Sequence, residues 1–187
     1  MRKYISYLTV LFALMLTGLL ASACAAYPVP TETAATPAPS KPDWFGVPLE
    51  DAQSGETFTI NDFAGKVVLI QTFAEWCPTC AYQANEVRDM VNALGNPTGL
   101  VLVSLDTDLH EDKASLKKYA DYFDFGWRFA VSPLEVSHAL GNLYSAEYLN
   151  PPLEPMLIID RDGVVYGLPY GFKYSEQLKN TLEQYLQ

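Results

Sequence analysis

Apolar residues along this chain gather in short runs, and most of these runs are bounded by turn-forming residues. Two of them, 67–73 and 100–105, are almost entirely apolar, as in strands that are buried on both faces of a sheet. The run at 156–160 precedes Arg161-Asp162-Gly163, which predicts a hairpin turn with a return strand over 164–168. Shorter extended pieces are expected at 51–60, where a turn precedes the strand, and within 125–131.

Between the strands, apolar residues recur three or four positions apart, which is the spacing of an amphipathic helix. The predicted helices span 77–94, 112–123, 133–144 and 174–186. Gly95-Asn96-Pro97 ends the first of them, and Pro133 suits the first turn of the third. Strands that alternate with helices and end in a hairpin and a helix predict an α/β fold, with a central mixed β-sheet and helices on both faces.

The N-terminus has the pattern of a secretory signal peptide over residues 1–23. Two basic residues precede an apolar stretch at 8–20, and small residues then lead to Cys24. The stretch is shorter than the roughly 20 residues of a membrane-spanning helix, which argues against an uncleaved anchor. Residues 20–24 resemble a bacterial lipobox, which implies a lipid on Cys24. Ordinary signal-peptidase cleavage after Ala23 is the alternative.

The rest of the chain divides into a tether and one domain. Residues 24–43 are rich in Pro, Ala and Thr and lack the apolar content of a core, so we expect a semi-extended tether. Residues 44–187 fit a single domain without an evident repeat. The formal charge of −10 becomes −12 without the two basic residues of the signal peptide. This acidity argues against nucleic acid and anionic lipid as partners, so membrane attachment would rest on the lipid at Cys24.

The candidate chemistry lies in Trp76-Cys77-Pro78-Thr79-Cys80, where an apolar strand meets the start of a helix. The helix N-terminus offers unpaired N–H groups and the positive end of the helix dipole, and both favour the thiolate of Cys77. Cys80 lies one turn deeper. We expect it to be less exposed than Cys77 and to keep its proton until it resolves a mixed disulfide.

The composition leaves few other roles for this cysteine pair. A disulfide across two intervening residues closes too small a loop to constrain the unfolded chain, so it is predicted to be chemical rather than structural. A structural zinc site normally takes four ligands, and the domain has no second pair of cysteines. We therefore expect no metal and no cofactor beyond the redox-active Cys77–Cys80 disulfide.

The residues around the pair carry a family resemblance. Residues 73–80, which follow a buried strand, resemble the active site of thioredoxin-fold proteins. The lead-in at 58–66 and an insertion over 106–149 are similar to the TlpA/ResA group of extracytoplasmic thiol–disulfide oxidoreductases, and the likeness covers nearly all of 44–187. It implies a thioredoxin-like fold with an N-terminal β extension and a central insertion.

The same resemblance implies roles for individual residues. Cys77 is then the nucleophile, Cys80 is the resolving thiol, and Trp76 shields the site. Pro155 is the candidate for the cis-proline that lines the substrate groove in this fold. Pro78-Thr79 stands between the cysteines, where the dipeptide influences the reduction potential, so the direction of electron flow stays open.

One departure concerns the proton of the resolving cysteine. Thioredoxin has a buried aspartate where this chain has Gln71, and an amide cannot accept the proton of Cys80. Another base or water must serve instead. Glu75 is nearby, although a solvent-facing acid is the simpler interpretation of this residue.

The function that follows is thiol–disulfide exchange with protein substrates outside the cytoplasm, preferentially as a reductant. Resemblance to the TlpA/ResA group suggests cysteines of apocytochrome c or of copper proteins as substrates. A membrane electron donor would then have to recharge the dithiol. We expect a monomer that is anchored by the lipid on Cys24 to the outer face of the cytoplasmic membrane, in the cell envelope or periplasm.

Two other functions compete with this one. A Sco-like copper metallochaperone would use the cysteine pair and a distal histidine, for which His138 is the candidate, although the Sco spacing between cysteines is longer. A peroxiredoxin-like peroxidase would need a Thr or Ser three residues before its reactive cysteine, and this chain has Ala74 there.

Overall fold

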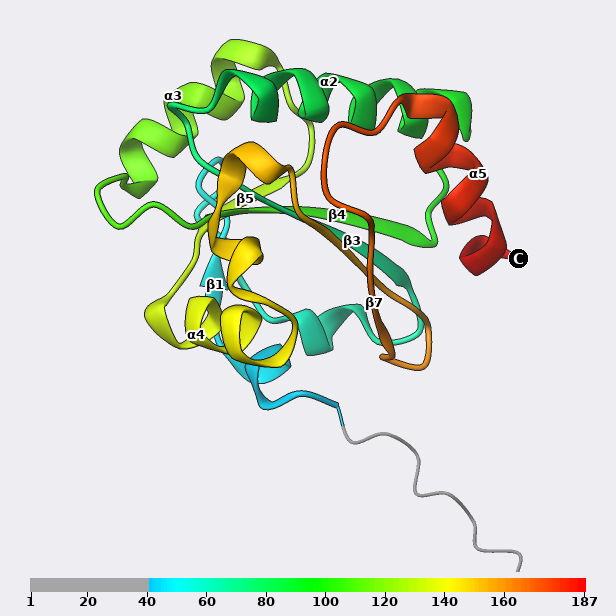
Figure 1. Ribbon diagram of the computed structural model, residues 1–187, viewed down its shortest axis with the longest axis horizontal. Helices are drawn as coiled ribbons and strands as arrows, with labels where there is room; N and C mark the ends of the chain where they lie inside the picture. Colours follow the sequence, from blue (N-terminus) through cyan, green and yellow to red (C-terminus); the bar gives the residue numbers. More distant parts are fainter. Residues whose placement is uncertain (1–40) are drawn as a thin grey trace, which may run out of the picture. The chain divides into compact units, whose positions relative to one another are not determined.

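The computed structural model of the protein describes residues 41–187 (Figure 1). Its centre is a five-stranded sheet in the order β5-β4-β3-β6-β7. The strands are β3 (Val67–Phe73), β4 (Leu100–Asp106), β5 (Arg128–Val131), β6 (Met156–Ile159) and β7 (Val165–Gly167). The pairs β3–β4 and β4–β5 are parallel, whereas β3–β6 and β6–β7 are antiparallel. The expected mixed α/β sheet is therefore confirmed.

Helices cover both faces of this sheet. The four α-helices are α2 (Pro78–Ala93), α3 (Lys113–Phe123), α4 (Leu134–Leu143) and α5 (Ser175–Leu186). In Figure 1, α2, α3 and α5 lie on one face and α4 lies on the other. Side chains alternate between the faces of a strand, and β3 shows this directly. Val67 and Leu69 pack in the core with α2 and α5, whereas Val68 and Ile70 pack in the core with α4.

The register of the parallel strands determines where a site can form. β3 and β4 pair residue by residue from Val67↔Leu100 to Phe73↔Asp106, so their carboxyl ends meet at one edge of the sheet. Ligands of open α/β sheets bind outside this edge. The Trp-Cys-Pro-Thr-Cys segment leaves β3 at the same edge and enters α2.

The N-terminal extension contains the expected turn and strand within 51–60, and it adds a short strand before the turn that was not predicted. Leu49–Glu50 (β1) and Thr57–Phe58 (β2) form a separate two-stranded antiparallel sheet. The residues between them form a turn, because the Asp51 carboxylate accepts bonds from the backbone and hydroxyl of Ser54 and Gly55 adopts a left-handed φ of 75°. Short 3₁₀ helices at Asp43–Gly46 and Ile60–Phe63 flank this sheet.

The central insertion between β4 and β6 contains α3, β5, α4 and two 3₁₀ helices, Ala146–Leu149 and Pro151–Leu153. The described helices include none that is both long enough and apolar enough to cross a membrane. The predicted signal peptide, the lipidation site Cys24 and nearly all of the tether lie outside the described residues.

Candidate active site

The two active-site cysteines form a disulfide at the start of α2. Cys77 is the N-cap residue of the helix, and Pro78 occupies the first helical turn, where a missing N–H has no cost. The backbone N–H of Cys80 donates to Sγ of Cys77 at 3.2 Å, and the two sulfur atoms are bonded to each other. Once the disulfide is reduced, this N–H and the helix dipole stabilise the thiolate of Cys77.

The two sulfur atoms differ in their hydrogen-bond partners rather than in exposure. We expected Cys77 to be the more exposed, but both cysteines are 1% exposed. Sγ of Cys80 lies 3.3 Å from the carbonyl oxygen of Pro151. After reduction the Cys80 thiol can donate to this oxygen, which favours its protonated form. The bonds therefore support Cys77 as the nucleophile and Cys80 as the resolving thiol.

Gln71 supports the first turn of α2 from below. It is buried in β3, and its Nε2 donates to the carbonyl oxygen of Cys80 at 3.4 Å. An amide in this position holds the helix against the sheet but cannot take a proton from a thiol. The base that the exchange reaction requires must therefore lie elsewhere.

Trp76 and the dipeptide between the cysteines form the outer surface of the site. The Trp76 side chain is 56% exposed, and its indole N–H donates to Oδ2 of Asp108 at 2.6 Å, which turns the ring towards the loop after β4. Pro78 and Thr79 are exposed. The Thr79 hydroxyl lies 3.5 Å from Sγ of Cys77, which makes it the nearest polar side chain to the expected nucleophile among the bonds of the described residues.

Glu75 belongs to a cluster of three carboxyl groups with Asp106 and Glu111. It is half-buried and accepts a bond from the Ser115 hydroxyl at 2.7 Å, so it is not simply a solvent-facing acid. Burial raises its pKa, and the Ser115 bond partly offsets this. Glu111 accepts the backbone N–H groups of Glu75 and Trp76 at 2.8 and 3.3 Å. The cluster therefore fixes the turn that precedes Cys77.

Asp106 is the most buried member of this cluster. Desolvation, followed by the nearby Glu111 and Glu75, raises its pKa to about 8, although the N–H of Asp108 lowers it. Its Oδ2 atom is buried and has no donor to accept from. A proton on Asp106 explains this atom, because the carboxylic acid can then donate to Glu111.

Pro155 does not occupy the expected conformation. Residues 41–187 contain no cis peptide bond, so the cis-proline prediction is wrong for this structure. The turn into β6 is instead made by Glu154, whose φ of 50° and ψ of 52° are left-handed. The carbonyl of Pro155 accepts the backbone N–H of Thr72 at 3.2 Å and extends the β3–β6 ladder. The carbonyl of Pro151, rather than Pro155, is the polar group of this loop that contacts the cysteine pair.

Glu154 and Lys173 are site residues that sequence reasoning missed. Both are buried, at 4% and 8% exposure. Nζ of Lys173 donates to the carbonyl oxygen of Glu154 at 2.8 Å. Burial raises the pKa of the Glu154 carboxyl group, and Thr79 and the charge of Lys173 partly offset this. The available signal was weak: a glutamate before Pro155, in a proline-rich loop that leads into a buried strand. The partner lysine is far along the chain, with nothing in its surroundings to mark it.

Neither histidine joins the cysteine pair. His138 is exposed on α4, which packs on the face of the sheet opposite α2. His110 is exposed and bonded to Asp108. Among residues 41–187, one set of three potential metal ligands lies together, and it is the carboxyl cluster rather than the cysteines. The copper-chaperone alternative therefore lacks its histidine ligand in this structure. Ala74, which weighed against a peroxidase, is fully buried next to the disulfide loop.

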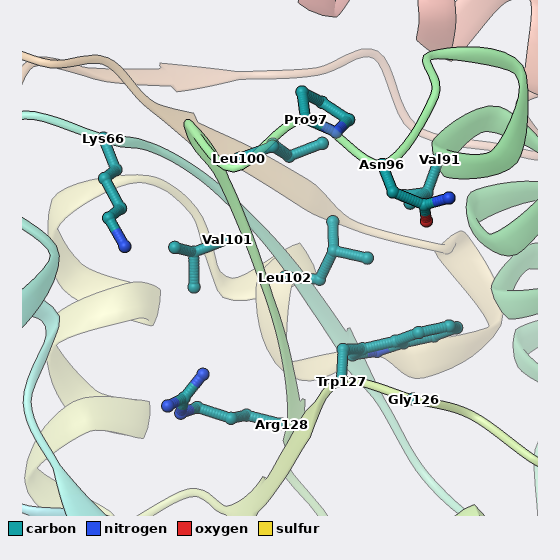
Figure 2. Close-up of a pocket in the computed structure, with 10 residues that line it drawn as sticks. All are labelled: Lys66, Val91, Asn96, Pro97, Leu100, Val101, Leu102, Gly126, Trp127 and Arg128. Carbon is teal, nitrogen blue, oxygen red and sulfur yellow. The ribbon is translucent and has the colours of Figure 1, made fainter.

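A surface hollow of about 340 Å³ lies at the other end of the parallel strands. It is lined by Leu100 and Val101 at the start of β4, with Lys66 and Arg128 on one side and Trp127 below (Figure 2). The Arg128 guanidinium is already engaged, because it stacks over two phenylalanine rings and pairs with Glu56 at 3.4 Å. This hollow is separate from the disulfide, which follows the carboxyl end of β3.

The fold and the disulfide define the class of protein first: a thioredoxin-fold protein with a dithiol/disulfide centre at a helix N-terminus. Residues 28–186 match the family model described as Redoxin, and the chain therefore belongs to the redoxin family. Family membership and the Cys77–Cys80 pair together make it a thioredoxin-like thiol–disulfide oxidoreductase.

Individual relatives agree with this family. Thiol-disulfide oxidoreductase ResA of Bacillus thuringiensis is 26% identical over 132 residues, which cover 71% of this chain and 68% of the relative. Thioredoxin-like protein YneN of Bacillus subtilis is 20% identical over 130 residues, covering 70% and 71% respectively. The likeness to ResA bears out the resemblance to the TlpA/ResA group.

Solved structures show the same fold. A thiol:disulfide interchange protein from Chlorobium tepidum superposes with a TM-score of 0.63 at 17% identity, over 75% of this chain and 93% of the other. The exposed lipoprotein thioredoxin Etrx1 of Streptococcus pneumoniae superposes with a TM-score of 0.56 at 20% identity, over 74% and 98%. The thioredoxin-like fold is thus confirmed.

Proposed function

We propose that this protein is an exported, lipid-anchored disulfide reductase that acts on cysteines of other proteins. Its substrates are cysteine pairs that must be reduced before a haem or copper ion is attached, as in apocytochrome c or a copper protein. A membrane electron donor returns the Cys77–Cys80 disulfide to the dithiol. The disulfide itself is the redox group, and no further cofactor or metal takes part.

One observation carries the exchange mechanism: Cys77 caps α2 and accepts the backbone N–H of Cys80. The arrangement stabilises a thiolate on Cys77, while the Pro151 carbonyl favours the thiol form of Cys80. Cys77 therefore attacks the substrate disulfide, and Cys80 resolves the mixed disulfide that forms.

The exported location rests on the N-terminal sequence. An apolar stretch, small residues and Cys24 form the lipobox-like pattern, and a structurally similar thioredoxin of Streptococcus pneumoniae is described as an exposed lipoprotein. The acidic domain gives no electrostatic attraction to anionic lipid. Attachment to the outer face of the cytoplasmic membrane therefore depends on the acyl chains at Cys24.

The reduction potential of the Cys77–Cys80 pair tests the direction of electron flow. A dedicated reductant is expected to have a reduction potential below roughly −200 mV, closer to that of thioredoxin. A strong oxidant has a reduction potential of about −120 mV. Equilibration of the purified protein with glutathione or dithiothreitol buffers measures this value. A potential near that of the strong oxidant contradicts a reductase.

Metabolic labelling with a radioactive fatty acid tests the anchor. The wild type should incorporate the label and sediment with membranes, whereas Cys24→Ser should do neither. Wild-type protein that is exported but released without label indicates ordinary signal cleavage after Ala23 and overturns the lipid anchor.

A further inference from the structure

A buried backbone carbonyl lies against the resolving cysteine. The carbonyl oxygen of Pro151 is 3.3 Å from Sγ of Cys80, and it also accepts the backbone N–H of Glu154 at 2.8 Å. A carbonyl oxygen has two lone pairs, so it can accept from both groups at once. In the disulfide the Cys80 sulfur has no proton to donate, whereas in the dithiol it has one. The contact therefore becomes a hydrogen bond only when the protein is reduced.

The loop that carries this carbonyl, residues 151–155, is bonded to a segment just before α5. The Leu153 carbonyl accepts the backbone N–H of Gly171 at 2.8 Å. The ammonium group of Lys173 donates to the carbonyls of Glu154 and Gly171 at 2.8 and 2.6 Å. Lys173 thus ties the loop to its own segment.

Gln83 joins that segment to the helix that carries the cysteines. Its side chain is buried in α2, three residues after Cys80. Nε2 of Gln83 donates to the Lys173 carbonyl at 2.8 Å, and Oε1 accepts the Lys173 backbone N–H at 2.7 Å. We call Gln83 and Lys173 the clamp. The clamp and the contact between Cys80 and Pro151 close a ring, in which each part fixes the position of the others.

The polar character of the clamp indicates a role beyond filling space. Both side chains are buried, and burying an amide or an ammonium group costs free energy unless it is hydrogen-bonded. Apolar side chains could fill the same volume without this cost. Every bond that the clamp makes goes to a backbone group. These two side chains therefore hold backbone segments at fixed distances from α2.

The other polar groups near the disulfide act on the backbone or on the other cysteine. Gln71 donates to the carbonyl of Cys80 rather than to its sulfur. Glu111 accepts two N–H groups of the turn before the cysteine pair, and the Thr79 hydroxyl lies near the other sulfur. Among the bonds of residues 41–187, the Pro151 carbonyl is the one polar partner of Sγ of Cys80.

We propose that Gln83 and Lys173 are positioning residues for the resolving cysteine, because they hold the Pro151 carbonyl where it accepts the hydrogen bond of the reduced Cys80 thiol. This inference rests on the proposed exchange function, and it identifies what keeps the proton on Cys80 while Cys77 attacks. Both residues act through the 151–155 loop rather than on a sulfur atom.

The proton on Cys80 has a defined course in the reaction. The Cys77 thiolate bonds to one substrate sulfur, and the other substrate sulfur leaves with the electron pair of the broken bond and takes a proton from water. Cys80 then gives its proton to water, and its sulfur bonds to Sγ of Cys77. The first substrate sulfur leaves with the electron pair of the mixed disulfide, so the substrate gains the two electrons that the protein loses. The clamp acts before this second step, while Cys80 is still a thiol.

Removal of the clamp without a change in charge tests this proposal. Gln83→Met keeps the length of the side chain but loses both bonds to Lys173. In a Cys77→Ser background, alkylation of Cys80 by iodoacetamide is followed by mass spectrometry of its peptide over the pH range around the ordinary thiol pKa of about 8.5. Because the thiol loses its acceptor, the pH of half-maximal rate should fall by about 0.5 to 1 unit. In a Cys80→Ser background, the same substitution should leave the half-maximal pH of Cys77 unchanged.

The reduction potential of the intact cysteine pair gives a second readout. The dithiol makes a hydrogen bond that the disulfide cannot make, so the clamp favours the reduced form. Gln83→Met should shift the equilibrium with glutathione towards the disulfide by about 3- to 10-fold, which makes the potential more negative by up to about 30 mV. Gln184→Met is the matched control, because Gln184 is exposed on α5. It should change neither readout.

Lys173→Met decides the question if Gln83→Met does not fold. Loss of the positive charge by itself would disfavour the Cys80 thiolate and raise the half-maximal pH, whereas loss of the positioned carbonyl lowers it. A fall in Lys173→Met therefore has the clamp as its cause. Lys173→Arg keeps the charge and the donors and should stay close to the parent value.

Three results overturn the proposal: a half-maximal pH of Cys80 that does not fall when the clamp is removed, an equal fall for both cysteines, or an unchanged reduction potential. Equal falls indicate a general opening of the site to water. Wild-type protein whose Cys77 does not react with glutathione disulfide contradicts the exchange function alone, since alkylation of Cys80 still measures the clamp.

Discussion

Two buried carboxyl groups border the disulfide loop, and they differ in the charges around them. Asp106 lies among Glu75 and Glu111, and both neighbours act on it as like charges. Glu154 is also buried, but the charge that acts on it is the cation of Lys173. Burial disfavours a carboxylate in either place. Only at Glu154 does a neighbouring positive charge offset it.

The difference gives the two acids different roles. Asp106 retains its proton to about pH 8 and donates to Glu111, which holds the turn before Cys77 through two backbone N–H groups. The proton on Asp106 therefore stabilises the turn and takes no part in the exchange reaction. Glu154 lies instead beside the cation of Lys173, which opposes the effect of burial on its pKa. Comparable burial therefore leaves a protonated support at one site and an acid with a cationic neighbour at the other.

The largest effect should come from removing the cation. Lys173→Met leaves two carbonyl oxygens without their donor and Glu154 without its opposite charge. A buried acceptor left without its donor costs about 1–3 kcal/mol of unfolding free energy, and this variant leaves two of them. Urea unfolding of the oxidised protein measures the loss. Lys179→Met is the control, because Lys179 forms a partly exposed pair with Glu183 in α5, worth about 0.5 kcal/mol. Equal losses in the two variants contradict the role of Lys173.

A pH-dependent effect should follow from Asp106. A pKa of about 8 in the folded protein exceeds the unfolded value of about 3.9, so the folded state binds more protons between pH 4 and pH 8. Unfolding free energy should therefore fall as pH rises through this window, and the contribution is fully present only below the unfolded value. The amide of Asp106→Asn can still donate to Glu111, but it does not titrate, so this variant should lose the pH dependence. At pH 8 its unfolding free energy should exceed that of wild type by about 1–3 kcal/mol.

Thermal or urea unfolding at pH 5 and pH 8 measures the Asp106 contribution. The quantity compared is the difference in unfolding free energy between Asp106→Asn and wild type, since other groups titrate equally in both. Lys173, whose pKa is lowered to about 8 by burial, contributes above this window rather than within it. A difference that stays constant between the two pH values shows that Asp106 is already ionised.

A smaller effect is expected at Glu111. Glu111→Gln keeps one acceptor oxygen for the turn but loses the second and the charge that receives the Asp106 proton. We expect a loss of about 1–2 kcal/mol of unfolding free energy, together with a slower reaction of Cys77 with glutathione disulfide at every pH. Glu135→Gln, an exposed acid in the first turn of α4, serves as the control. Unfolding free energy and reaction rates equal to those of wild type contradict this role of Glu111.

The sequence predicted the parts of the fold that depend on local patterns. The strand expected at 67–73 matches β3 residue for residue, because a short, nearly continuous apolar run after Gly65-Lys66 is typical of a strand that is buried on both faces. Cys77 as the helix cap followed from the same run and from Pro78. The turn and strand within 51–60 were predicted, but the two-residue strand β1 before them was missed, because so short a strand leaves no apolar/polar pattern.

The missing parts of the site depend on loops that join distant residues. Glu154 and Lys173 meet because Glu154 and Gly171 both adopt left-handed conformations, with φ values of 50° and 89°. No hydrophobic period marks such positions. The proline next to Glu154 instead pointed to a cis bond at Pro155, which the structure does not contain. Backbone geometry, rather than residue type, brings Glu154 and Lys173 together.

The central claim is that Cys77 attacks and Cys80 resolves, and trapping of the mixed disulfide tests it most directly. Reduced Cys80→Ser and reduced Cys77→Ser are each mixed with glutathione disulfide at pH 7 and quenched with acid, and the products are identified by intact mass and peptide mapping. The account predicts rapid, stable addition of one glutathione to Cys77 in Cys80→Ser and at least about tenfold slower addition to Cys80 in Cys77→Ser. Equal rates, or faster addition to Cys80, contradict it.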